Sequence, residues 1–237
     1  MFRYETHCHT KEASRCGKLS GADVARMYKD LGYDGIFITD HFFNGSSAVD
    51  PSLPWEEKVA VYLSGFENAK AEGEKIGLDV FLGIEFWFYA TEFLVYGPDR
   101  AFLLANPDLD RLDMRELLTR CREQGYFCVH AHPFRQRGYI KTLRLYPDLT
   151  DAVETLNAAH PETDHFVFDR RAQAYADSYG LPFTGGSDCH VPDQRWMGGI
   201  LCEERIACWQ DYAAAVKTRR VAPFREPHDR TKPMKFD

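Results

Sequence analysis

The sequence predicts an α/β fold in which strands and helices alternate around a largely parallel sheet. Short apolar runs typical of strands are separated by longer segments with the 3.6-residue periodicity of amphipathic helices. Glycines such as Gly32 and Gly77 follow the helical segments where a helix would end. With 237 residues the chain is long enough for one sizeable core, so we expect a single domain.

The elements follow one another in the order that this fold class requires. The predicted strands cover residues 2–6, 35–39, 80–88, 93–96, 126–129, 152–156, 183–184 and 200–202. The predicted helices cover residues 20–31, 55–76, 113–124 and 165–179. Ser20, with Asp23 three positions later, is placed to cap the first helix. From Lys217 the chain is basic and interrupted by prolines, so we predict a barrel over 1–216 and a surface tail over 217–237.

Composition excludes several classes of protein. A net charge of −7 argues against a large nucleic-acid interface, which needs a basic face. The seven cysteines are scattered and form no C-x-x-C pair, so they indicate neither a disulfide framework nor a structural zinc knuckle. The sequence has no apolar leader and no apolar run long enough to span a membrane. We therefore expect a cytoplasmic protein without a membrane partner.

Metal-competent side chains recur where the strand-like runs end. His7 and His9 are two positions apart on one strand and therefore face the same side. The candidate ligands from this pattern are His7, His9, His41, Glu85, His130 or His132, Asp188 and His190. In a βα barrel the C-terminal ends of the strands converge on one face, so these residues would meet there. Nitrogen and carboxylate ligands suit zinc, manganese or iron.

Each position alone also allows a simpler interpretation. Isolated His-x-His pairs are common at half-buried strand ends, and Glu85 could be held by a salt bridge. Asp40 and Asp188 could cap helices. The remaining histidines are predicted to lie on the surface: His160, His165 and His228.

Five short motifs occur in a fixed order along the chain. They are His7-Cys8-His9-Thr10, Ile38-Thr39-Asp40-His41, Gly83-Ile84-Glu85, His132-Pro133-Phe134-Arg135 and Gly186-Ser187-Asp188-Cys189-His190. This series resembles that of the PHP (polymerase and histidinol phosphatase) family. The resemblance implies a distorted (β/α)7 barrel that holds two or three divalent metal ions at its C-terminal face.

Carried over position by position, the resemblance also implies which residues share each ion. The first ion would be held by His7, His9, Glu85 and Asp188, the second by Glu85 and His132, and the third by His41 and His190. Two positions depart from the family pattern. Arg15 or Cys16 stands where the family has a histidine or aspartate, and Glu92 stands where it has a histidine. Either the Cys16 thiolate serves the third ion or the site holds two.

The implied activity is hydrolysis of a small phosphate monoester by a metal-bound hydroxide. Arg135 could grip phosphate oxygens, with Arg195 as a second candidate, although either could instead form a surface salt bridge. Asp40 is better placed to orient a ligand or a water molecule than to bind metal.

Three alternatives remain open from the sequence. A phosphodiesterase or exonuclease-like activity is disfavoured by the acidic balance. An amidohydrolase-type metal barrel usually needs a bridging lysine, and no lysine ends a predicted strand. A homologue that binds metal without catalysis is the third alternative. The sequence predicts neither the substrate's identity nor the oligomeric state.

Overall fold

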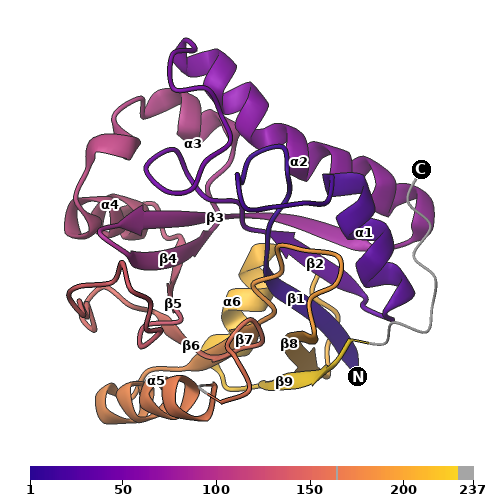
Figure 1. Cartoon of the computed structure of the whole chain (residues 1–237), viewed down its shortest axis with the longest axis vertical. Helices are drawn as coiled ribbons and strands as arrows, with labels where there is room; N and C mark the ends of the chain where they lie inside the picture. The colour runs from indigo at the N-terminus through magenta and orange to yellow at the C-terminus, as the bar shows by residue number, and fades with distance from the viewer. Residues whose placement is uncertain (164, 229–237) are drawn as a thin grey trace.

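The computed structural model describes residues 1–163 and 165–228 and contains a nearly closed, barrel-shaped sheet (Figure 1). The strands are β1 (Phe2–Cys8), β2 (Gly35–Ile38), β3 (Asp79–Phe88), β4 (Thr91–Tyr96), β5 (Phe127–Ala131), β6 (Ala152–Asn157), β7 (Phe183–Gly186), β8 (Trp196–Cys202) and β9 (Val221–Pro227). The helices are α1 (Gly21–Asp30), α2 (Trp55–Ile76), α3 (Arg100–Ala105), the 3-10 helix η1 (Leu109–Arg111), α4 (Met114–Glu123), α5 (His165–Tyr179) and α6 (Trp209–Lys217). The described strands are ordered β7-β6-β5-β4-β3-β2-β1-β8-β9.

The sheet is mixed rather than largely parallel. Strands β1, β2 and β3 pair in parallel, as do β5, β6 and β7. Helices α1, α2 and α5 connect these strands as predicted, but residues 132–151 between β5 and β6 contain no helix. Strand β4 is antiparallel to both of its neighbours, and β8 is antiparallel to β1 and β9. Only Tyr89 and Ala90 separate β3 from β4, which is too short for a crossover and dictates a hairpin. The α/β class is therefore confirmed, whereas the count of a distorted (β/α)7 barrel is not.

The curled sheet brings the segment after β7 back against β1. The Thr6 hydroxyl donates to the Gly185 carbonyl at 2.9 Å, and the His9 amide donates to the Cys189 carbonyl at 3.0 Å. Cys8 and Cys189 form a parallel bridge between the two segments. Residues nearly two hundred positions apart in the chain thus become neighbours at the ends of β1 and β7.

Glycines let α1 and α2 pack closely on the outside of the sheet (Figure 1). A Cβ atom added at Gly21 would lie 1.9 Å from the Gly65 carbonyl oxygen, so the helix crossing requires a glycine there. The Ser20 hydroxyl accepts from the Asp23 amide, as the sequence predicted. Helix α2 ends at Gly77, whose φ of 71° suits a glycine C-cap.

An aromatic cluster fills one end of the barrel. Tyr212 of α6 lies with its ring 4.9 Å from those of Phe37 and Tyr96 and 5.6 Å from that of Phe127. Tyr96 pairs in register with Phe127 at the start of β5, whereas His132 follows the end of that strand. The aromatic residues therefore occupy the end of the barrel opposite the predicted ligands.

The predicted boundary at residue 217 is wrong. Lys217 ends α6, and β9 then pairs with β8 along its whole length. Pro223 and Pro227 are tolerated because β9 is an edge strand of the described sheet. The last part of the predicted tail, residues 229–237, lies outside the described residues. Elsewhere, α3, η1 and α6 were not predicted as helices.

Two expectations from composition can be compared with the structure. All seven cysteines are free, which agrees with the expected lack of a disulfide framework. Among the helices in the described part of the chain, none combines the length and apolar character needed to cross a bilayer.

Candidate metal centre

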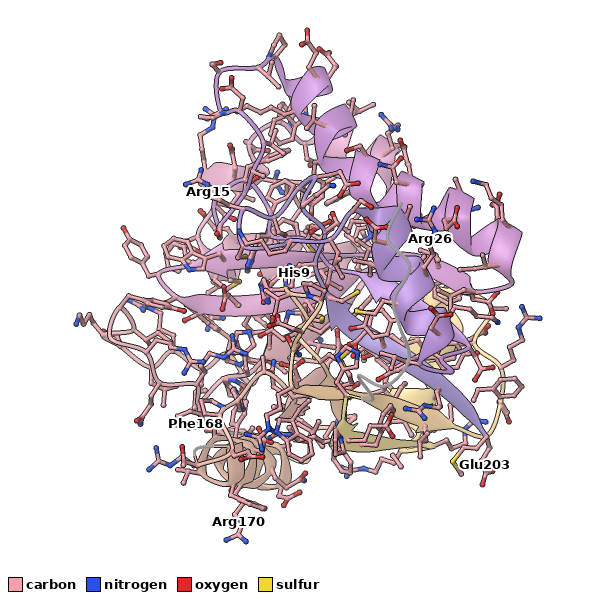
Figure 2. All side chains as sticks on the ribbon, turned by 45° about the vertical axis from the view of Figure 1, so that its right-hand side comes forward. His9, Arg15, Arg26, Phe168, Arg170 and Glu203 are labelled. Carbon is pink, nitrogen blue, oxygen red and sulfur yellow. The ribbon has the colours of Figure 1, made fainter. Side chains whose placement is uncertain are left out.

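A buried cluster of histidines and carboxylates lies at the ends of β1, β2, β5 and β7, beside Glu85 within β3 and Glu92 near the start of β4. It gathers eight predicted ligands: His7, His9, His41, Glu85, Glu92, His132, Asp188 and His190. Figure 2 shows one of them, His9, in the middle of the molecule. His7 and Glu85 are completely buried and His9 is 1% exposed. Convergence of the strand ends has thus brought together side chains from five separate motifs.

Glu85 is the centre of this cluster. Its Oε1 atom lies 3.2 Å from His7 Nε2 and 3.3 Å from His132 Nε2. Its Oε2 atom lies 2.7 Å from His41 Nδ1 and 3.5 Å from His9 Nε2. One carboxylate that reaches four imidazoles with two oxygens is placed to bridge neighbouring ions.

Asp188 occupies the other side of the histidine pair. Its Oδ1 atom lies 3.4 Å from His7 Nε2 and 3.3 Å from His9 Nε2. Burial opposes the charged form of Asp188, but Arg135 and His7 outweigh burial and hold its pKa well below the usual range. Asp188 therefore remains a carboxylate, the form that binds cations.

Strained backbone conformations present two of these ligands. Asp188 has φ of 50° and His132 has φ of 28°, in the left-handed region that non-glycine residues rarely adopt. Such strain persists only where surrounding contacts impose it, and it is concentrated at functional sites. Here it turns each side chain out of its strand and into the cluster.

Several buried polar atoms of the cluster contact one another but form no hydrogen bond of normal geometry with any described residue. These atoms are His7 Nε2, His9 Nε2, His41 Nδ1 and Glu85 Oε2. Buried polar groups are normally paired because an unpaired one costs free energy. Imidazole nitrogens and carboxylate oxygens are the donors that zinc, manganese and iron accept, so the residues present fit divalent ions.

Glu154, which was not among the predicted site residues, forms hydrogen bonds with two of the predicted ligands. Its Oε1 atom lies 2.9 Å from His7 Nδ1, and its Oε2 atom accepts from the His132 amide at 2.9 Å. Asn157 Nδ2 also donates to Oε2, at 3.0 Å. A carboxylate on the far nitrogen of a ligating histidine fixes the ring and increases its basicity. Glu154 interrupts an apolar strand just as Glu85 does, and that signal could have identified it.

Asp40 supports His9 in a similar way, through Ser14. The Ser14 hydroxyl donates to Asp40 Oδ1 at 2.6 Å and lies 3.1 Å from His9 Nδ1. Since its proton goes to Asp40, Ser14 accepts from the Nδ1–H group, which leaves His9 Nε2 free for a metal ion. The Thr10 amide and hydroxyl each donate to Asp40 at 2.7 Å. This arrangement agrees with the prediction that Asp40 orients a ligand; Ser14 was missed because no motif marks it.

His41, His190 and His9 form a further group with Cys16 beside it. The rings of His9 and His190 stack 4.1 Å apart. Burial raises the pKa of the Cys16 thiol, but hydrogen bonds with His190 and His41 outweigh burial and lower it to about 6. Cys16 therefore lies where the third predicted ion would need another ligand. Glu92, at the other departure from the family pattern, lies 3.5 Å from His132 Nε2.

The two predicted arginines differ in position. The Arg135 guanidinium pairs with Asp188 and is largely buried, so it lies at the cluster. Arg195 does not join it, because its side chain is 71% exposed and pairs with Glu162 at 3.1 Å. Proximity to His190 in the sequence was a misleading guide, since the chain turns away after that residue.

Other histidines also depart from expectation. Of the two alternatives after β5, only His132 reaches the cluster, because the His130 ring stacks on Phe93 at 4.3 Å. His160 is 3% exposed and lies 2.8 Å from Asp169, while His228 is 7% exposed and contacts the Gln194 carbonyl. The predicted surface positions of His160 and His228 are therefore wrong. The side chain of His165 lies outside the described residues.

Comparisons with known proteins agree with this geometry. Residues 169–221 match a family model described as PHP-associated. A two-domain protein from Bacteroides vulgatus, which contains a predicted PHP-like metal-dependent phosphoesterase, has a similar structure with a TM-score of 0.68 and 18% identity. The alignment covers 94% of this chain and 64% of that one, so this chain spans less than two thirds of its length.

Two further solved structures share the fold. PsfC from Pseudomonas syringae has a TM-score of 0.60 and 19% identity, covering 94% of this chain and 92% of PsfC. An amidohydrolase from Chromobacterium violaceum, solved with bound sulfate and no metal, has a TM-score of 0.53 and 15% identity, covering 93% and 97%. Among curated proteins, none matches this chain. The PHP-associated match over residues 169–221 and the fold shared with a PHP-like protein agree with the resemblance carried by the five motifs.

Proposed function

We propose that this metal-dependent hydrolase cleaves small phosphate monoesters with the help of two or three divalent ions. The observation that carries the proposal is the convergence of buried histidines on Glu85 and Asp188. Of these histidines, His7, His9 and His41 each have a ring nitrogen that faces the carboxylates and forms no hydrogen bond among the described residues. The ions, zinc, manganese or iron, would be held by His7, His9, His41, Glu85, Glu92, His132, Asp188 and His190, with Cys16 as a further ligand. The printed description of the Bacteroides vulgatus protein as containing a phosphoesterase supports the same reaction class.

The residues of this chain supply the rest of the chemistry. Bound divalent ions would lower the pKa of a water molecule and neutralise phosphoryl oxygens. Arg135 has donors left for the phosphate, because its Nε atom lacks a partner among the described residues. An arginine guanidinium binds two phosphate oxygens at once, so Arg135 would hold the transferred group in place. Glu154 and Asp40 keep the imidazoles of His7 and His9 in the orientation that binding needs.

An amidohydrolase activity is the second candidate, supported by the similarity to the Chromobacterium violaceum amidohydrolase. The two enzyme types differ in the bond that they cleave. Turnover of amides or lactones, without turnover of phosphate esters, would favour the second candidate.

Elemental analysis of the purified protein, combined with a panel of phosphomonoesters with and without manganese, tests the first candidate. We expect bound divalent metal and metal-stimulated release of phosphate. His9→Ala and Asp188→Ala should each lower metal content and reduce turnover by about a thousandfold or more. Arg195→Ala, a change at the exposed arginine, is the control and should retain both properties. A wild-type protein that takes up no metal and releases no phosphate would refute the proposal.

A further inference from the structure

A cysteine lies at the edge of the metal centre, on a tight turn. The Gly17 amide donates to the Ser14 carbonyl at 3.0 Å, which makes Cys16 the third residue of a β-turn. The Cys16 thiol is in hydrogen-bonding contact with the imidazoles of His41 and His190. Its sulfur atom is therefore held against two candidate ligands of the third ion.

Hydrogen bonds fix this turn on both sides of Cys16. Before it, the Ser14 hydroxyl donates to Asp40 Oδ1 at 2.6 Å. After it, the Lys18 amide donates to the His190 carbonyl at 2.8 Å. Because the flanking residues are bound to the frame of the metal centre, Cys16 keeps its place beside the imidazoles.

The neighbouring histidines have nitrogens available for an ion. His9, His41 and His190 each offer one ligand atom, and these atoms lie within 4.8 Å of one another. His9 Nε2 and His41 Nδ1 are buried and form no hydrogen bond among the described residues. Imidazole nitrogens and a cysteine thiolate form a donor set that zinc accepts. Cys16 therefore adds sulfur to a centre whose other candidate ligands are nitrogen and oxygen atoms.

A thiolate differs from those other ligands in its chemistry towards oxidants. A peroxide converts a thiolate to a sulfenic acid, which lacks the negative sulfur that binds metal. All seven cysteines lie in the described part of the chain; five are buried, whereas Cys16 and Cys208 are half-buried. A small oxidant can therefore reach Cys16 more readily than the buried thiols.

We propose that Cys16 is a redox switch for the third ion, so that oxidation of its thiolate by a peroxide releases that ion and slows hydrolysis. This inference rests on the proposed function, with a third ion held by His41, His190 and Cys16. The thiolate sulfur attacks one oxygen of hydrogen peroxide, the O–O bond breaks, and the departing hydroxide takes up a proton to become water. Sulfur is oxidised and the peroxide is reduced.

Small thiols reverse this oxidation. One thiol forms a mixed disulfide with the sulfenic sulfur, and water leaves. A second thiol attacks the mixed disulfide, which frees the Cys16 thiolate and yields a small disulfide. The switch is therefore reversible as long as the sulfur is not oxidised further.

Metal release from the zinc-loaded protein tests this inference without relying on turnover. Zinc has no redox chemistry of its own, so peroxide can act only on the protein. We expect hydrogen peroxide to release about one zinc ion per chain to a chromogenic chelator and to leave a sulfenic acid on Cys16. Hydrolysis should fall at the same rate. A thiol reductant with added zinc should restore both.

Two variants and a cobalt spectrum assign the effect to one sulfur. Cys16→Asp supplies an oxygen ligand that peroxide does not oxidise, so it should keep its zinc in peroxide. The cobalt-loaded wild type should show thiolate-to-cobalt charge-transfer absorption in the near ultraviolet, and Cys16→Asp should lose it. Cys208→Ser is the control, because Cys208 is also half-buried but lines a separate cavity with Trp209. It should keep both the absorption and the sensitivity to peroxide.

The outcomes separate this inference from the proposed function. Equal zinc loss from wild type and Cys16→Asp, or a cobalt-loaded wild type without the absorption, would overturn the switch while leaving the phosphatase intact. Zinc loss that Cys208→Ser abolishes would also overturn it. If no phosphate ester turns over, the proposed function fails. Peroxide-dependent zinc release that Cys16→Asp abolishes would then still support the switch, and full retention of zinc by the wild type would refute it.

Discussion

The two ends of the barrel treat buried polar atoms in opposite ways. At the aromatic end the tyrosine hydroxyls are paired: Tyr96 donates to the Thr6 carbonyl at 2.7 Å, and Tyr212 lies 2.9 Å from the Thr184 hydroxyl. At the other end His7, His9 and Glu85 each leave a buried atom without a hydrogen bond among the described residues. The same strands supply both ends. At the aromatic end the protein itself satisfies the buried polar atoms, whereas at the other end a bound ligand would satisfy them.

Truncation at the aromatic end should separate stability from metal binding. Tyr212→Ala removes a ring that packs on Phe37, Tyr96 and Phe127, and we expect it to lower the free energy of unfolding by about 3–5 kcal/mol. Denaturant unfolding of the metal-free protein measures this loss. The fraction that remains folded should bind the normal amount of metal.

Tyr212→Phe is the matched control, because it keeps the ring and removes only the hydroxyl. It should cost about 1 kcal/mol, the value of one hydrogen bond. If the folded fraction of either variant lost its metal, the two ends would not be independent and the comparison would fail.

Glu5 lies between the two ends, and its burial makes the ionised form of its carboxyl group unfavourable. It accepts from the His7 amide at 2.7 Å, the Ser187 amide at 2.9 Å and the Tyr28 hydroxyl at 2.8 Å. Burial nevertheless raises its pKa to about 7, above the value of 4.5 for a free side chain. The folded state therefore binds a proton that the unfolded state has already lost between these two pH values.

Stability should consequently fall as the pH rises from about 4.5 to about 7, by up to about 3 kcal/mol from this group. Unfolding of the metal-free protein across this range measures the slope. Glu5→Gln, which has the same shape and does not titrate, should flatten the profile relative to wild type. An unchanged difference between the two proteins at all pH values would show that Glu5 does not carry the dependence.

The sequence predicted the residues of the cluster better than the residues that hold them in place. The predicted ligands lie near strand ends or within short motifs, so position and residue type together predicted a set that the structure brings into one cluster. Glu154 and Ser14 act through other residues and belong to no motif, so only their contacts reveal them. Arg195 shows the converse, because a place near His190 in the chain did not bring it to the site.

The fold prediction was wrong at two elements, the β3–β4 hairpin and strand β9, for similar physical reasons. The β3–β4 turn contains Tyr89 and Ala90, both with positive φ, in place of the glycine or asparagine that usually marks such a hairpin. Strand β9 carries Pro223 and Pro227 and was interpreted as tail, because the sequence does not show that it is an edge strand. Helices and parallel strands with strong periodicity were predicted correctly, since local pattern and tertiary position agree there.

The smallest expected effect comes from changing a residue that holds the predicted ligands in place. Glu154→Gln keeps an oxygen for the His132 amide but removes the negative charge beside His7 Nδ1. Because such a carboxylate increases the basicity of a ligating imidazole, we expect metal affinity to fall by about 10–100-fold. Competition with a chelator of known affinity measures the change. Glu162→Gln, at an exposed acid that pairs with Arg195, is the control and should leave affinity unaltered. If Glu154→Gln lowered the free energy of unfolding as Tyr212→Ala does, without altering metal affinity, Glu154 would stabilise the fold rather than the metal centre.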